Sequence, residues 1–313
     1  MSLEQKIQAI NRAQSQQDAP APSTPDPLSL RNILMATDFS ECSARALGYA
    51  LGIAARYGAQ LHVLHCIDPA PYNLVTPDAV ETAYEAAWRD MHRLESDLRN
   101  NGLTKNVEVK FRVEAAGVPA ILPEIVRDLD LGLIVVGTHG RTGWRKVVLG
   151  SVAEIVVDHA SCPVLTVGPS TDRHRLEQFG PESILFASDP SARSRLAESY
   201  AFSLAQKYNS RLTVADVLEN HAGRVLARVS QFEWSESELK DATVERASTT
   251  LPQLPTEIGT ERDLILQVAD DAAADLIVLT VPATHKFTNR FLSTTSYRVV
   301  CGAPCPVLTL RAG

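Results

Sequence analysis

The sequence predicts an α/β protein built from two tandem doubly wound domains, each with a five-stranded parallel sheet. Two observations predict this class. Apolar runs of strand length alternate with helical segments, and the same alternation occurs twice along the chain. The length of 313 residues also fits two domains, at about 100–200 residues each. We therefore expect repeated β-α-β units with right-handed crossovers.

The internal repeat is visible in two ungapped alignments of the chain with itself. Residues 31–68 match residues 182–219 at an offset of 151 positions, with 13 of 38 identical. Residues 133–167 match residues 276–310 at an offset of 143 positions, with 12 of 35 identical. Both copies of the second stretch contain the run CPVLT near their ends. The two halves are therefore interpreted as one duplicated domain.

Composition places the boundaries of the two copies. Residues 1–28 are rich in Gln, Pro, Ser and Asp, and we expect them to form a flexible N-terminal extension. The first domain is expected over residues 29–169 and the second over residues 181–313. Between them, residues 170–180 (STDRHRLEQFG) interrupt the alternating pattern and are interpreted as a linker.

Each element of the first half is predicted from its apolar spacing and from the residues at its ends. Ser40 is expected to cap the first helix, and Gly58 to follow its last turn. The predicted strands are Asn32–Thr37, Gln60–Ile67, Val107–Glu114, Leu131–Gly137 and Cys162–Val167. The predicted helices are Phe39–Tyr57, Pro77–Asn101, Val118–Asp128 and Gly150–Ala160. In the second half the third strand is weakly marked, and Pro255–Gly259 is the candidate for it.

A glycine-rich loop is the sharpest local motif. It runs from Gly137 to Ser151 as GTHGRTGWRKVVLGS and has the spacing G-x2-G-x9-G-S. Glycine lets backbone amides approach a ligand closely, and the helix that follows the loop begins with unpaired amides at its positive end. These features predict an anion cradle suited to phosphate. His139 and Arg141 flank Gly140, and two interpretations of them stay open: further contacts with phosphate, or part of a solvated loop. For the loop as a whole, the alternative interpretation is a glycine-rich turn that binds no ligand.

Asp38 is the second candidate functional residue. It follows the first predicted strand, and ligands in open parallel sheets bind beyond the carboxyl ends of the strands, where the winding reverses. If the first and fourth strands are neighbours, Asp38 and Gly137 face each other across that crevice. The alternative is that Asp38 only caps the following turn, and both roles are compatible.

These features together resemble the universal stress protein family, as a tandem pair, over residues 29–169 and 181–312. In that family the spacing G-x2-G-x9-G-[ST] marks members that bind ATP. The resemblance therefore implies a Rossmann-like fold of the adenine nucleotide alpha hydrolase-like type, with ATP and Mg as the ligand. It also implies that the last strands of the two halves pair within one chain, as an intramolecular pseudo-dimer. Further dimerisation of the whole chain is left open.

The resemblance also implies roles for individual residues. Asp38 would contact the adenosine part of the nucleotide, and a main-chain group at Cys66 would read the adenine. Ala36 is the small residue found two positions before the Asp. The phosphate and ribose positions of the family are matched by Gly137, Gly140, Gly150 and Ser151.

The second half has lost the glycines of this loop. Its equivalents of the four matched loop residues are Thr280, Ala283, Ser293 and Thr294. Side chains would therefore stand where the backbone should approach phosphates, and Pro282 removes one amide donor. We expect the second half to be mainly structural and the chain to bind one nucleotide.

Composition and charge exclude several other classes. The 37 acidic residues outnumber the 30 basic ones, a net charge of -7 that disfavours nucleic-acid binding. No apolar run reaches the ~18 residues of a membrane span, and the first residues lack the apolar core of a signal peptide. The five cysteines are sparse and odd in number, which is typical of reduced thiols. We therefore expect a cytoplasmic protein that binds neither nucleic acid nor membrane.

The leading hypothesis is a stress-response regulatory protein that binds ATP in its first half and presents the loop surface to a regulatory protein partner. No residue has the context of a general base, so we expect no catalytic residues and no metal site in the protein itself. Two alternatives stay open. One is a slow ATPase or adenylating enzyme of the related α/β superfamily, and the other is a nucleotide-free interaction scaffold.

Overall fold

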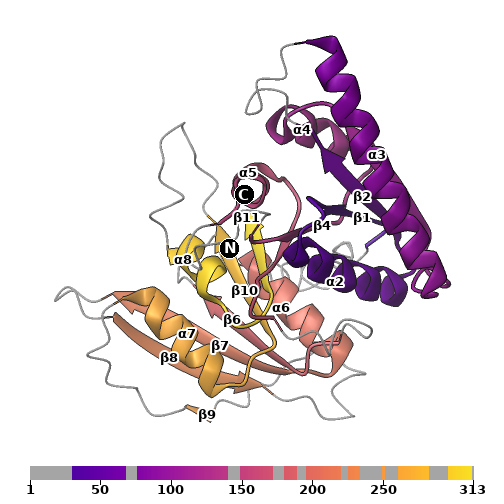
Figure 1. Ribbon diagram of the computed structural model, residues 1–313. Coiled ribbons are helices and arrows are strands. Elements are labelled where there is room, and N and C mark those ends of the chain that lie inside the picture. The colour runs from indigo at the N-terminus through magenta and orange to yellow at the C-terminus, as the bar shows by residue number, and fades with distance from the viewer. Residues whose placement is uncertain are drawn as a thin grey trace, which may run out of the picture.

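The computed structural model describes residues 30–67, 76–139, 149–171, 180–188, 195–219, 225–232, 249–250, 260–281 and 295–311. Within these ranges eleven strands form one continuous sheet, and helices cover both of its faces (Figure 1). The predicted N-terminal extension, most of the predicted linker and the strand candidate Pro255–Gly259 lie outside the described residues.

The helices and strands follow the predicted alternation. The first half comprises β1 (Asn32–Ala36), α2 (Glu41–Tyr57), β2 (Gln60–Cys66), α3 (Pro77–Asn100), β3 (Val109–Glu114), α4 (Val118–Asp128), β4 (Leu133–Gly137), α5 (Ser151–His159) and β5 (Val164–Val167). The second half comprises β6 (Ser183–Ser188), α6 (Arg195–Tyr208), β7 (Arg211–Glu219), β8 (Val225–Phe232), β9 (Thr249–Thr250), α7 (Glu261–Asp271), β10 (Leu276–Val281), α8 (Thr295–Gly302) and β11 (Val307–Arg311).

The strand order places the winding reversal between β1 and β4. The order across the sheet is β3-β2-β1-β4-β5-β11-β10-β6-β7-β8-β9. The five strands of the first half are parallel to one another, as predicted. From β1 the chain winds outward through β2 and β3 and then returns to the other side of β1 with β4 and β5. A crevice for a ligand is expected at this reversal, at the carboxyl ends of β1 and β4.

The second half departs from the prediction of five parallel strands. Its strands β6, β7, β10 and β11 are parallel, but β8 pairs with β7 antiparallel, and β9 pairs with β8 in the same way. Only residues 220–224 separate β7 from β8. A parallel neighbour needs a crossover of a dozen or more residues, whereas a short connection allows an antiparallel hairpin. In the described part of this half, the position beside β7 that corresponds to β3 is therefore occupied by an antiparallel strand.

The two halves meet through their last strands. β5 and β11 pair antiparallel, so the two copies of the five-residue run CPVLT lie side by side at the middle of the sheet. The Thr166 hydroxyl donates to the Val307 carbonyl at 3.1 Å, and the Thr309 hydroxyl donates to the Val164 carbonyl at 3.2 Å. These four residues are equivalent in the repeat, so the junction is locally two-fold symmetric.

Each face of the sheet carries its own hydrophobic core. Ile33 and Met35 point to one face, which α2, α3 and α6 cover, and Leu34 points to the other, which α4, α5, α7 and α8 cover. Both cores contain buried residues of both halves, so apolar packing continues across the β5–β11 junction. Among the described residues, no helix combines the length and the apolar character needed to cross a membrane.

Candidate functional site

The candidate site lies where β1 and β4 end. The two strands pair in parallel, with Ala36 beside Val136, so the segments that follow them leave the same edge of the sheet. The Ser40 hydroxyl donates to the His139 carbonyl at 3.4 Å and links the two segments. The first and fourth strands are thus neighbours, which is the condition stated in the sequence analysis, and the structure brings Asp38 and Gly137 to one edge.

Asp38 shapes the turn between β1 and α2. Its Oδ1 accepts a hydrogen bond from the Ser40 amide at 3.0 Å, and Ser40 in turn caps α2 by accepting from the Ser43 amide at 3.2 Å. Between them Phe39 has a φ of 61°, a left-handed conformation that is rare for a bulky side chain. This turn holds the Asp38 carboxylate, which is partly exposed, at the carboxyl edge of the sheet.

Phe39 connects this turn to the end of β2. Its ring lies 4.7 Å from the His65 ring, centroid to centroid. The His65 Nδ1 makes a 2.8 Å hydrogen bond with the Thr37 carbonyl. Cys66, the last residue of β2, is partly exposed next to this contact, and so is Ala36 at the end of β1. The ends of β1, β2 and β4 therefore form one edge that contains Ala36, Asp38, Cys66 and Gly137.

Gly137 has a packing role that the sequence analysis did not foresee. A Cβ at this position would lie 3.0 Å from the Cys42 carbonyl carbon and 3.0 Å from the Ser43 backbone nitrogen. Backbone atoms cannot move aside as the end of a flexible side chain can, so only glycine lets α2 begin this close to β4. Close approach of the start of α2 is therefore sufficient to explain a glycine at this position.

The start of α5 forms a second side of the candidate site. Gly150 is the N-cap residue, with φ -63° and ψ 147°, and its carbonyl accepts from the Glu154 amide at 2.9 Å. As glycine it provides no capping side chain, and Ser151 is exposed in the first turn. The first amides of a helix have no acceptor within the helix, so this end suits an anion. The Gly150 amide itself donates to the Thr138 carbonyl at 2.7 Å.

The residues next to Gly137 are tied to the sheet. The Thr138 amide donates to the Val167 carbonyl at 2.9 Å, and the Thr138 hydroxyl makes a 2.8 Å hydrogen bond with the His139 Nδ1. The His139 side chain is buried, and this hydrogen bond directs its Nδ1 toward Thr138. Gly140 and Arg141, with the rest of the loop up to residue 148, lie outside the described residues.

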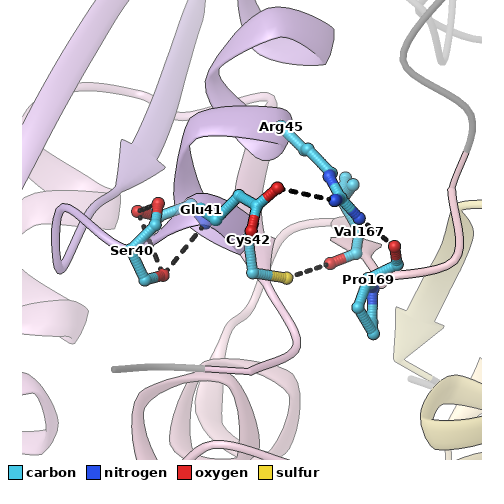
Figure 2. Close-up of polar contacts among 7 residues, drawn as sticks. Ser40, Glu41, Cys42, Arg45, Val167 and Pro169 are labelled. Atoms are coloured by element: carbon cyan, nitrogen blue, oxygen red, sulfur yellow. Dashed lines mark hydrogen bonds and ion pairs between the residues drawn. The ribbon is translucent and has the colours of Figure 1, made fainter. Parts of the chain in front are cut away.

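The start of α2 is anchored on the segment that leaves the first half. Figure 2 shows the Cys42 thiol donating to the Val167 carbonyl at 3.2 Å, and the Arg45 guanidinium donating to the Pro169 carbonyl. Arg45 also pairs with Glu41 one turn earlier, at 3.0 Å. The edge that carries Asp38 is thereby joined to the chain entering the predicted linker. No sequence signal marked Cys42 or Arg45 for this role.

One carboxyl near the start of α5 is electrostatically perturbed. The pKa of Glu154 is raised, first by burial and second by the nearby Asp158 carboxylate. The neutral form of Glu154 is therefore favoured more than that of an exposed glutamate. Within the described ranges, no three His, Cys, Asp or Glu side chains are placed to hold a metal ion together.

The corresponding edge of the second half is only partly described. Thr280, the equivalent of Gly137, lies near the end of β10, and its carbonyl accepts from the Ser296 hydroxyl at 3.1 Å. Its own hydroxyl is buried without a hydrogen-bond partner among the described residues. The other substituted positions, Pro282, Ala283, Ser293 and Thr294, lie outside these residues.

Comparisons with known proteins agree with the geometry. The sequence profile of the Universal stress protein family matches residues 29–168 and again residues 181–311. A universal stress protein of Methanocaldococcus jannaschii is 32% identical over 145 residues, which are 44% of this chain and 81% of that protein. A putative universal stress protein of Staphylococcus epidermidis is 32% identical over 149 residues, 45% of this chain and 85% of that protein.

Several solved structures match both halves together. The crystal structure of a universal stress protein from Archaeoglobus fulgidus has a TM-score of 0.60 at 18% identity, covering 90% of this chain and 98% of that one. At this identity the likeness concerns the fold, and it extends over nearly the whole tandem arrangement.

Proposed function

The chain belongs to the universal stress protein family, in two tandem copies, and from this premise we propose that it is a stress-related regulatory protein whose first half binds one ATP with Mg. The observation that carries the proposal is the shared edge of β1 and β4, to which the Asp38 carboxylate and the start of α5, a helix without a side-chain cap, both belong. A carboxylate suits sugar hydroxyls, and a helix N-terminus suits phosphates.

The residues fit an adenine nucleotide in the following arrangement. Asp38 accepts hydrogen bonds from the ribose, and the main chain at Cys66 faces the adenine. The first turn of α5 and the Ser151 hydroxyl hold the phosphates. Gly140 gives the loop its close approach to them, with His139 and Arg141 on either side. Mg would neutralise phosphate charge when bound.

The second half supports this site in the proposal. In this proposal the chain is an intramolecular pseudo-dimer of one domain at residues 29–169 and another at 181–313, joined by a linker at 170–180, and the β5–β11 pairing supports it. One half carries the nucleotide, and the other completes the sheet. A regulatory protein partner in the cytoplasm would bind differently to the loop with nucleotide and to the loop without it.

The test is to purify the chain without added nucleotide, denature it, and identify the released compounds by chromatography and mass. We expect about one adenine nucleotide per chain. Gly140→Val should lose it, because a branched side chain fills the phosphate approach. Ala283→Val, the same change at the equivalent position of the second half, is the matched control and should retain it.

Each outcome separates the hypotheses. No release, and no binding of added Mg-ATP by calorimetry, would overturn nucleotide binding and leave the interaction scaffold. Two nucleotides per chain, one of them lost in Ala283→Val, would overturn the single site. Conversion of bound ATP to ADP or AMP during incubation would favour the ATPase or adenylating alternative over a purely regulatory role.

A further inference from the structure

A side chain of the second half contacts the end of the glycine loop in the first half. The Leu149 amide donates a hydrogen bond to the Tyr297 hydroxyl at 3.1 Å. Tyr297 lies in the first turn of α8, and the two residues are 148 positions apart in the sequence. Tyr297 is 6% exposed and Leu149 2%, so water does not compete readily for this bond.

The contact lies at the point where the loop becomes the phosphate-binding helix end. Leu149 immediately precedes Gly150, the N-cap of α5. The next amide, that of Gly150, donates to the Thr138 carbonyl at 2.7 Å. Two consecutive amides therefore have acceptors in different parts of the chain. The Gly150 amide bonds to the residue that follows β4, and the Leu149 amide bonds to a side chain of the second half. Together these bonds orient the backbone that enters the first turn of α5.

The Tyr297 hydroxyl is well placed to remain a neutral hydrogen-bonding group. Burial is the main cause that raises the pKa of Tyr297, the nearby Cys301 adds to the rise, and the hydrogen bond from the Leu149 amide acts in the opposite direction. Cys301 lies one turn further along α8, and its thiol hydrogen-bonds with the Tyr297 side chain. Val299 and Val300 of the same helix are buried in the core that also contains α5. The phenol is thus carried by a helix fixed in the shared core.

This contact is not a simple copy within the repeat. At the offset of 143 positions, the first-half equivalent of Tyr297 is Glu154, a carboxylate in place of a phenol. The second half has thus lost the glycines of its own loop while it places a different residue against the loop of its neighbour. A structural partner that only completed the sheet would not require a buried hydroxyl at this position.

We infer that Tyr297 is a positioning residue through which the second half sets the affinity of the nucleotide site in the first half. This inference rests on the proposed function. The inference adds a way to regulate the proposed nucleotide site. Any change that shifts α8 relative to β11 or α7 would move the start of α5 and so change the affinity for phosphate. Tyr297 itself acts through Leu149 and Gly150, without touching the nucleotide.

The test compares Tyr297→Phe with Tyr57→Phe. Both changes delete one phenol oxygen at the junction of the halves, but Tyr57 lies at the end of α2, near the amino-terminal edge of the strands and away from the loop. Three quantities are measured: the dissociation constant for Mg-ATP by calorimetry, the hydrogen-exchange rate of the Leu149 amide by NMR, and the midpoint of urea unfolding.

For Tyr297→Phe we expect ATP affinity to fall about three- to tenfold, the range given by one lost hydrogen bond to a buried group. The Leu149 amide should exchange faster even without nucleotide, and the unfolding midpoint should change no more than in Tyr57→Phe. Tyr57→Phe should bind ATP like the wild type and leave the exchange of Leu149 unchanged.

The outcomes separate this inference from the proposed function. If the wild type binds ATP and Tyr297→Phe binds it equally well, the positioning role is overturned while the nucleotide site stands. If the wild type binds no ATP, the proposed function fails, and the positioning role fails with it. If both phenylalanine variants lose affinity to the same extent, the effect belongs to the junction in general, and the specific role of Tyr297 is overturned.

Discussion

Tyr57 and Tyr208 occupy equivalent positions in the two halves, and their rings meet edge to face with centroids 6.4 Å apart. The preceding residues, Arg56 and Lys207, are also equivalent, and each lies over the ring of the opposite half. Lys207 Nζ is 3.9 Å from the centroid of Tyr57, and the Arg56 guanidinium carbon is 5.5 Å from that of Tyr208. These four residues thus form a second local two-fold contact between the halves, in which α2 meets α6.

Replacing these tyrosines should reveal direct coupling between the halves. Tyr57→Ala and Tyr208→Ala should each lower the free energy of unfolding by about 2–4 kcal/mol, because each removes a large ring at the junction. The double variant should lose about 1 kcal/mol less than the sum, since an aromatic pair can be broken only once. Urea unfolding followed by tryptophan fluorescence measures all four proteins of this cycle.

Tyr84 provides the control for that cycle. It is 38% exposed on α3 and contacts Trp88, with no part in the junction. Tyr84→Ala combined with Tyr208→Ala should therefore be additive to within about 0.5 kcal/mol. Full additivity of Tyr57→Ala with Tyr208→Ala would show that the two rings do not support each other.

Gly137→Ala should destabilise the protein in the absence of any nucleotide. The added methyl would lie 3.0 Å from backbone atoms of Cys42 and Ser43, and relieving this overlap should cost about 1–3 kcal/mol. Gly168→Ala is the matched control, because its nearest neighbour would be 3.7 Å away. A stable Gly137→Ala protein that had only lost nucleotide affinity would contradict the packing role and favour a ligand role for this glycine.

The two roles of Asp38 can be separated by a pair of substitutions. Asp38→Asn keeps a carbonyl oxygen for the Ser40 amide and should leave stability close to that of the wild type. Asp38→Ala removes this acceptor and should cost about 1 kcal/mol. Both should weaken ATP binding by about tenfold or more, because charge-assisted hydrogen bonds are the stronger ones. An Asp38→Asn protein with wild-type affinity would reduce Asp38 to a turn-forming residue.

His62 should make stability depend on pH. Its pKa is lowered from 6.5, mainly by burial and then by Arg112 and Lys110, with Glu108 acting in the opposite direction. The native state therefore takes up this proton only at lower pH than the unfolded state does. The free energy of unfolding should be constant above about pH 7.5 and should decrease as the pH falls below about 6.5, by up to about 1.4 kcal/mol per pH unit.

The matched variant for this pH effect is His62→Thr. Threonine stands at the equivalent position of the second half, Thr213, which is also buried. The variant loses the hydrogen bond between the His62 Nε2 and Asn32, 3.3 Å long, so its overall stability should drop. Its stability should nevertheless decline less between pH 7 and pH 5. Equal slopes for the two proteins would exclude His62 as the titrating group.

The local parts of the fold could be predicted from the sequence. Ser40 does cap α2, and Gly58 follows the helix with a φ of 62°, because caps depend on residues within one turn. Apolar spacing located β1 and β4, and the repeat located their counterparts. The shared edge of Asp38 and Gly137 followed from the general rule for parallel sheets.

Contacts between distant residues could not be predicted in the same way. The antiparallel β8 depends on the short connection after β7, which became visible only when the ends of the strands were known. The position of Gly137 in the glycine motif does not show whether a ligand or the start of α2 approaches it. The bond between Leu149 and Tyr297 joins two halves whose packing no local pattern describes.

The antiparallel junction of β5 and β11 has a consequence for which two domains pair with each other. An unpaired edge strand is a template for pairing with another chain, so free subunits that share such an edge can form mixed pairs. Here each edge is occupied by the other half, held nearby by covalent linkage. One gene therefore specifies one combination, an intact loop beside an altered one, in a fixed one-to-one ratio. The two copies are free to diverge for different tasks without competing for partners.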